Sequence, residues 1–111
     1  MRNEQRVHPR VSGPFEGRWQ RVSMHDSAVT RSSRIADVSV GGCFFESFEA
    51  MLRGERLRLD LHLPVAGWMS LSGEVVHSQP ERGFGVRFVN LGAKHQDALA
   101  RAVEHVQANT A

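Results

Sequence analysis

Alternating leucines in one short run constrain the fold of this chain most. In Leu57-Arg58-Leu59-Asp60-Leu61-His62-Leu63 every second residue is leucine, and the residues between are polar. Successive side chains of a β-strand point to opposite faces, so this pattern predicts a strand with one buried face and one face in water. Pro64 and Gly67 end the run. The fold therefore contains a sheet that lies over a core.

Five further segments have the mixture of aromatic, β-branched and polar residues that is typical of short strands. Turn residues separate them: Met24-His25-Asp26-Ser27 predicts a first hairpin, Gly41-Gly42 precedes the third strand, and Gln79-Pro80-Glu81-Arg82-Gly83 joins the last two. The expected strands cover residues 15–24, 29–38, 43–46, 68–78 and 83–89.

The end of the chain has a different period. From Ala93 to Gln107, the apolar residues Leu99, Ala102, Val103 and Val106 recur at helical spacing, with charged residues mostly elsewhere. This predicts one amphipathic helix over residues 93–107. Several short strands with frequent turns favour a small, mainly β barrel, because closure removes most sheet edges.

Length and composition indicate one small domain. The chain has 111 residues, of which 41% are hydrophobic and 23% charged, as is ordinary for a soluble globular protein. Residues 1–13 are polar and contain Pro9, and the turn residues Ser12-Gly13-Pro14 follow at the entry to the fold. We therefore expect a flexible tail over residues 1–13 and the barrel with its helix over residues 14–108.

Several classes of protein are disfavoured. No apolar run approaches the ~20 residues of a membrane span. The polar N-terminus lacks the apolar segment of a secretory signal, so the cytoplasm is the expected location. The single cysteine, Cys43, cannot form an internal disulfide, and its apolar neighbours Phe44 and Phe45 predict a buried structural role.

The basic residues indicate the kind of ligand. Of the 14 lysines and arginines only Lys94 is a lysine, while the net charge is +2. Arginine favours planar, two-point recognition of phosphate. So small an excess charge does not make the long basic stripe of a duplex-binding protein, and nucleic acid is therefore a disfavoured partner. A small anionic ligand fits better.

Two motifs carry the functional prediction. Arg6-Val7-His8-Pro9-Arg10 has the form RxxxR, and Asp37-Val38-Ser39-Val40-Gly41-Gly42 has the form DxSxxG. Two guanidiniums can fork onto phosphate oxygens or a guanine edge, and a carboxylate can accept from guanine N–H groups. Each motif alone has a simpler explanation, namely a solvated basic tail for the first and a stabilised turn for the second.

Together with their surroundings, these motifs resemble the PilZ domain, a family of bacterial receptors for the second messenger cyclic di-GMP. The similarity covers nearly the whole chain. It includes the entry segment from Gln5 to Val11, the stretch from Ile35 to Phe45, the strand Gly83-Phe84-Gly85-Val86-Arg87-Phe88 and the closing helix. The resemblance implies a six-stranded antiparallel β-barrel with a C-terminal α-helix.

The resemblance also implies a site. Arg6 and Arg10 would bind phosphate and guanine from the tail, Asp37 would accept from guanine nitrogens, Ser39 would supply a hydroxyl, and Gly42 would permit the turn and a close approach of the ligand. Gln5 and Gly41 adjoin these positions as further candidate contacts. Gln5 stands where many relatives carry arginine or an apolar residue, which leaves open whether one ligand or an intercalated pair binds, and whether the protein is a monomer or a ligand-dependent dimer.

The predicted function is therefore that of a cyclic di-GMP receptor or adaptor, with cyclic di-GMP as ligand and no cofactor. Binding would change the tail and the surface presented to a protein partner in motility, pilus, exopolysaccharide or biofilm functions. The alternative is a PilZ-type protein-interaction domain with weak or no ligand binding. No catalytic arrangement stands out, and the six histidines show no metal-ligand spacing, so we expect neither an enzyme nor a metal site.

Overall fold

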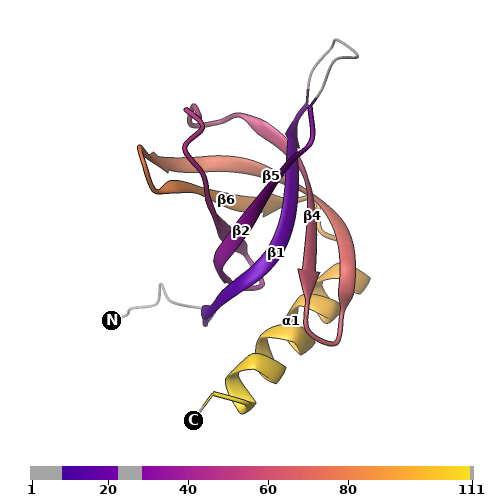
Figure 1. Ribbon diagram of the computed structural model, residues 1–111. Helices are drawn as coiled ribbons and strands as arrows, with labels where there is room; N and C mark the ends of the chain where they lie inside the picture. The colour runs from indigo at the N-terminus through magenta and orange to yellow at the C-terminus, as the bar shows by residue number, and fades with distance from the viewer. Residues whose placement is uncertain (1–8, 23–28, 111) are drawn as a thin grey trace, which may run out of the picture.

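The protein is described by a computed structural model over residues 9–22 and 29–110. Figure 1 shows strands wrapped into a barrel above one helix. The elements are β1 (Val11–Arg21), β2 (Arg31–Val38), β3 (Gly42–Glu46), β4 (Arg56–Leu63), β5 (Gly67–Gln79), β6 (Gly83–Val89) and α1 (Ala93–Ala108).

The six strands form a closed barrel in the order β1-β2-β3-β6-β5-β4, and every neighbouring pair is antiparallel. β3 pairs with β6 rather than with β4, which follows it in the chain, and β4 returns to pair with β1. Closure satisfies the backbone groups that an open sheet leaves at its edges. The six-stranded antiparallel barrel with a C-terminal helix is confirmed.

The leucine run points into the barrel as its alternation predicts. Leu57, Leu59, Leu61 and Leu63 of β4 are at most 1% exposed. Aromatic residues share the core with them: the Trp19 and Phe84 rings meet edge to face at 5.1 Å, and Phe45 stacks on Phe84 at 5.5 Å. The Trp19 indole N–H donates to the Ser33 hydroxyl at 3.1 Å, so its polar atom is satisfied inside the barrel wall.

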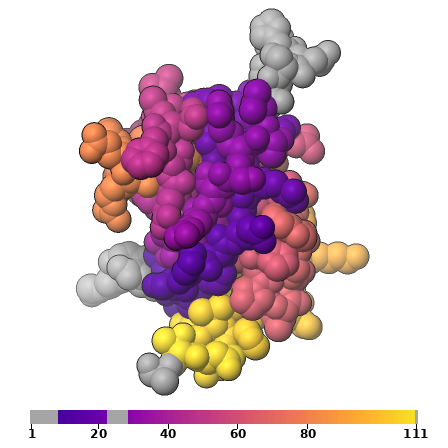
Figure 2. All heavy atoms as spheres, in the orientation of Figure 1, coloured from indigo at the N-terminus to yellow at the C-terminus, as the bar shows by residue number. Residues whose placement is uncertain are grey.

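The helix α1 covers one end of the barrel. Leu99, Ala102 and Val103 are buried, and Val106 packs against the same core. Figure 2 shows the helix in yellow under the strands, with the start of β1 in indigo directly above it. Among the described residues, no helix is long and apolar enough to cross a membrane.

Most strand boundaries agree with the predictions to within a residue, but the first two do not. β1 begins at Val11 rather than Phe15, because Val11 and Ser12 pair with Val38 and Asp37 of β2 despite the turn signal in Ser12-Gly13-Pro14. β2 begins at Arg31 rather than Val29. The turn predicted at residues 24–27 lies outside the described residues.

Candidate functional site

The connection between β2 and β3 is a tight turn that Ser39 organises. The Ser39 backbone N–H donates to the Gly42 carbonyl at 2.9 Å. Its hydroxyl oxygen accepts from the N–H groups of Gly41 and Gly42 at 3.1 and 3.3 Å. Ser39 is only 3% exposed. Such local side-chain bonds stabilise turns, so the serine of the second motif holds the turn in shape.

The last glycine of the motif is required by the sheet. A Cβ atom on Gly42 would lie 2.2 Å from the Val86 carbonyl oxygen of β6. Gly41 adds a second link, since its carbonyl accepts from the Phe88 N–H at 2.9 Å. The close approach of the β6 backbone is therefore a further reason for glycine at this position, and contact of Gly42 with a ligand stays a prediction.

Arg10 and Asp37 bring the two motifs together. The Arg10 Nε and Nη2 atoms donate to the Asp37 Oδ1 atom at 2.9 and 2.6 Å, across 27 residues of chain. Both side chains remain partly exposed, at 46% for Arg10 and 35% for Asp37. A charge-assisted pair at the surface stays accessible to a ligand that can bind both of its members.

A bulge in β2 gives Asp37 its direction. The pairing of β2 with β3 shifts register between Ile35 and Asp37. Ile35 and Val38 are buried on either side of this shift, whereas Asp37 faces outward beside Arg10. Bulges commonly re-aim a side chain in this way.

The candidate contacts Gln5 and Arg6 lie outside the described residues. Their part in a ligand site therefore stays a prediction, as does the role of the tail before Pro9. Of the sequence-predicted set, the structure brings together Arg10, Asp37, Ser39, Gly41 and Gly42 around the β2–β3 turn.

Next to Asp37, an aromatic row that the sequence did not predict crosses the outer face of the barrel. Asp37 of β2 pairs with Phe44 of β3. Phe44 pairs in turn with Gly85 of β6, and Gly85 pairs with His77 of β5. The His77 and Phe44 rings stack at 5.9 Å, and the His77 ring lies where a Cβ atom on Gly85 would be. The Arg82 guanidinium lies 5.9 Å from the Phe44 ring centre. The sequence held one signal for this row: Phe44 alternates with Cys43 and Phe45 along the strand, so its side chain lies on the opposite face from theirs.

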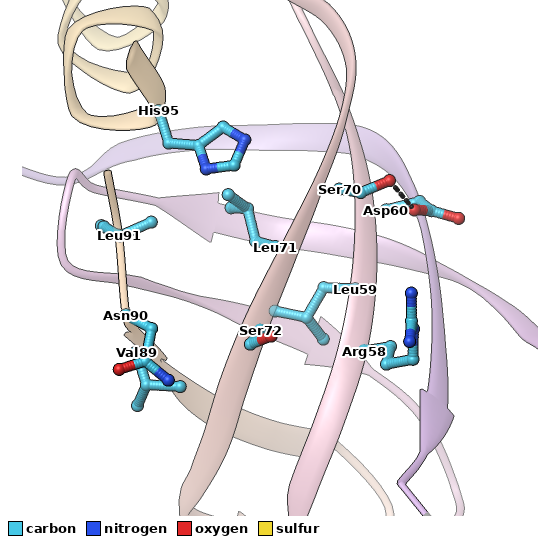
Figure 3. A pocket seen from close by; sticks show the side chains of 10 residues that line it. All are labelled: Arg58, Leu59, Asp60, Ser70, Leu71, Ser72, Val89, Asn90, Leu91 and His95. Atoms are coloured by element: carbon cyan, nitrogen blue, oxygen red, sulfur yellow. Dashed lines mark hydrogen bonds between the residues drawn. The ribbon is translucent and has the colours of Figure 1, made fainter. Parts of the chain in front are cut away.

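A hollow lies across the barrel from these motifs, between β4, β5 and the start of α1 (Figure 3). His95 from the helix and Leu71 from β5 face it. On its rim, the Ser70 hydroxyl donates to the Asp60 carboxylate at 2.7 Å. The same carboxylate is 3.7 Å from Arg18. These polar groups are therefore engaged with one another, and none of the described motif residues lines the hollow.

Two further sequence predictions concern Cys43 and metal binding. Cys43 is 1% exposed, and its burial raises the pKa of the thiol far above the ordinary value, with opposing smaller effects of Arg10 and Asp37. Within residues 9–22 and 29–110, no group of three or more histidine, cysteine and acidic side chains is placed to hold a metal ion.

Comparison with known proteins identifies the family. The PilZ domain model matches residues 2–105. Similar solved structures include the PilZ domain with c-di-GMP of YcgR from Escherichia coli, with a TM-score of 0.71 and 15% identity over 95% of this chain and 93% of that one. The PilZ domain of CeSA from a cellulose-synthesizing bacterium gives a TM-score of 0.68 and 15% identity, over 89% and 98% of the two chains.

The inhibitor of motility MotI/DgrA from Bacillus subtilis gives a TM-score of 0.72 and 19% identity. All of this chain is covered by that match but only 55% of the Bacillus protein, so this chain spans about half of its length. No curated protein matches the sequence. With a family match over nearly its whole length and the closed barrel with its end helix, the chain belongs to the PilZ domain family.

Proposed function

We propose that this PilZ domain is a receptor for cyclic di-GMP, bound on the outer face of β2 and β3. The observation that carries the proposal is the contact between Arg10 and Asp37, which joins one residue from each motif at the barrel surface. Arg6, four residues before Arg10, would approach the same ligand from the segment that precedes β1.

The chemistry of guanine matches this pair. The base carries acceptors at O6 and N7 and donors at N1 and N2, so it can accept from the Arg10 guanidinium while it donates to the Asp37 carboxylate. The bonds that the two residues make to each other are then exchanged for charge-assisted bonds of similar strength. The turn held by Ser39 fixes the position of Asp37 before a ligand arrives, which reduces the entropy cost of binding.

The similar structures support the same class of ligand and output. The Escherichia coli YcgR domain is described with c-di-GMP, and the Bacillus subtilis protein is an inhibitor of motility. We propose that the present domain acts as an adaptor, in which ligand binding changes the N-terminal tail and the surface offered to a partner protein. Motility, pilus, exopolysaccharide and biofilm functions are the expected settings.

Calorimetric titration of cyclic di-GMP tests the proposal. We expect saturable binding to the wild-type chain that excess GTP does not reduce. Asp37→Ala should weaken binding at least about tenfold, because a two-point guanine contact discriminates by ~1–3 kcal/mol. Arg6→Ala/Arg10→Ala should abolish it.

Asp97→Ala is the matched control, since Asp97 is also a surface aspartate paired with an arginine, Arg101 at 3.4 Å, but lies on α1. It should bind like the wild type. A flat wild-type titration at high ligand concentration would refute the receptor proposal.

That outcome would favour the second candidate, a protein-interaction domain with weak or no ligand binding. The observation in its favour is the loop between β3 and β4, where Phe48 is 87% and Leu52 is 74% exposed. Exposed apolar side chains of this size mark contact surfaces when they cluster.

A further inference from the structure

A hollow on the outer face of the barrel begins next to Asp37. Its volume is about 530 Å³, within the usual range of ligand pockets, ~300–1,000 Å³. Ala36, which precedes Asp37, and Phe44, which is its Cα partner on β3, both line this hollow. The hollow is therefore continuous with the place where the receptor proposal puts a guanine.

The side chains around the hollow can read a purine base. Arg34 of β2 and Arg82 of the β5–β6 hairpin supply guanidiniums, and Glu46 of β3 supplies a carboxylate. Phe48 supplies exposed aromatic surface, and the mostly buried Phe44 lies at the floor of the hollow. Arg34, Arg82 and Glu46 are exposed. Within the described residues Arg34 and Glu46 make no side-chain hydrogen bond or ion pair, so their hydrogen-bonding capacity is available.

Guanine makes specific demands that this set meets. Its O6 and N7 atoms accept from arginine, its N1 and N2 groups donate to a carboxylate, and its ring faces stack on aromatic side chains. Adenine shares N7 but has no O6, and its N1 atom is an acceptor that a carboxylate repels. A site with both an arginine and a glutamate on the edge of the base therefore selects guanine.

Cyclic di-GMP carries two guanines on one ring of two phosphates, and Arg10 with Asp37 accounts for one of them. We propose that the hollow between Arg34, Glu46 and Arg82 receives the second guanine. Glu46 accepts from N1 and N2, an arginine donates to O6 and N7, and the exposed Phe48 ring packs against the face of the base. This inference rests on the proposed function and adds a specificity determinant to it.

A mixed ligand separates the two base positions. The probe is the cyclic dinucleotide with one guanine and one adenine, titrated by calorimetry beside cyclic di-GMP. The wild type should bind cyclic di-GMP at least about tenfold more tightly than the mixed ligand. Glu46→Gln should weaken cyclic di-GMP binding by about the same factor but leave the mixed ligand within about threefold, so that the discrimination is lost.

Arg34→Ala tests the other edge of the base and should also reduce the discrimination between the two ligands. Glu104→Gln and Arg101→Ala make the same chemical changes at exposed positions on α1 and should leave both affinities unchanged. Thermal unfolding of each variant confirms that it is folded.

The failure of this inference is distinguishable from failure of the receptor proposal. Wild-type binding that Glu46→Gln and Arg34→Ala leave unchanged, or weaken equally for both ligands, would show that the hollow does not hold a guanine. Absence of wild-type binding to cyclic di-GMP would overturn both proposals together.

Discussion

At the scale of single residues, Gly42 has a role that a substitution can test. The β6 backbone leaves no space for a Cβ atom there, because that atom would lie 2.2 Å from the Val86 carbonyl oxygen. Gly42→Ala must therefore push β3 from β6 or distort the turn at Ser39. We expect a loss of about 1–3 kcal/mol in the free energy of unfolding, measured by urea titration.

Ligand binding by the same variant should also fall, since Asp37 lies at the end of β2, directly before the shifted turn. Gly92→Ala provides the comparison, because no atom lies within 4 Å of the Cβ position at Gly92. If Gly42→Ala were as stable as the wild type, the close approach of β6 would not explain the glycine.

The residues of the site differ in how far the sequence could predict them. The DxSxxG motif is local, so its serine and glycines predicted a turn that the structure contains. The pairing of Phe44 with His77 could not be predicted this way, because it depends on β3 lying beside β6 and β6 beside β5. For the same reason the sequence did not reveal that Gly42 also lies against the Val86 carbonyl of β6.

At the scale of elements, strong periodicity predicted β4 and α1 well, and local turn signals failed where tertiary pairing outweighed them. Ser12-Gly13-Pro14 indicated a tail, yet β1 begins at Val11 because β2 offers it a partner. The register shift of β1 between Ser12 and Phe15 accommodates the turn-forming residues within the strand. Such irregularities depend on the neighbouring strand and are invisible in a propensity pattern.

The segment that connects β3 to β4 is held by Glu55. Its carboxylate accepts from the Leu52 N–H at 2.6 Å and from the Arg21 Nε atom at 2.7 Å. Burial disfavours the ionised form, but these two bonds outweigh it and hold the pKa of Glu55 below its ordinary value of 4.5. The contribution of Glu55 to stability is therefore present above pH 4.5 and is lost as the pH falls through the lowered pKa.

Glu55→Gln should accordingly lower the free energy of unfolding by about 1–2 kcal/mol at neutral pH. The difference from the wild type should shrink below pH 4.5, where the wild-type carboxylate also becomes protonated. Urea titrations at both pH values measure this, with the exposed Glu81→Gln as the control. A difference that does not change with pH would contradict the role given to the ionised Glu55.

At the scale of the whole molecule, the barrel and the helix share one core. Leu99 of α1 is 0% exposed and belongs to the same buried cluster as Trp19, Phe45 and the β4 leucines. The strands have no open edge at which unfolding could begin separately. One core without a boundary between its parts should unfold in one transition.

Leu99→Ala tests whether the barrel and α1 unfold together, because it removes contacts only where the helix covers the end of the barrel. We expect a loss of about 2–5 kcal/mol in the free energy of unfolding. The measurement follows helical circular dichroism and Trp19 fluorescence together, in a Trp68→Phe background, since Trp68 is 45% exposed and would add a surface signal. Glu104→Ala, on the exposed side of α1, should change stability by less than about 0.5 kcal/mol.

The helical signal and the Trp19 fluorescence of Leu99→Ala should shift to the same lower midpoint. Loss of the helical signal before that of Trp19 would instead mean that α1 is a separately folding attachment, and a partner that binds the helix would then be able to detach it without opening the ligand face.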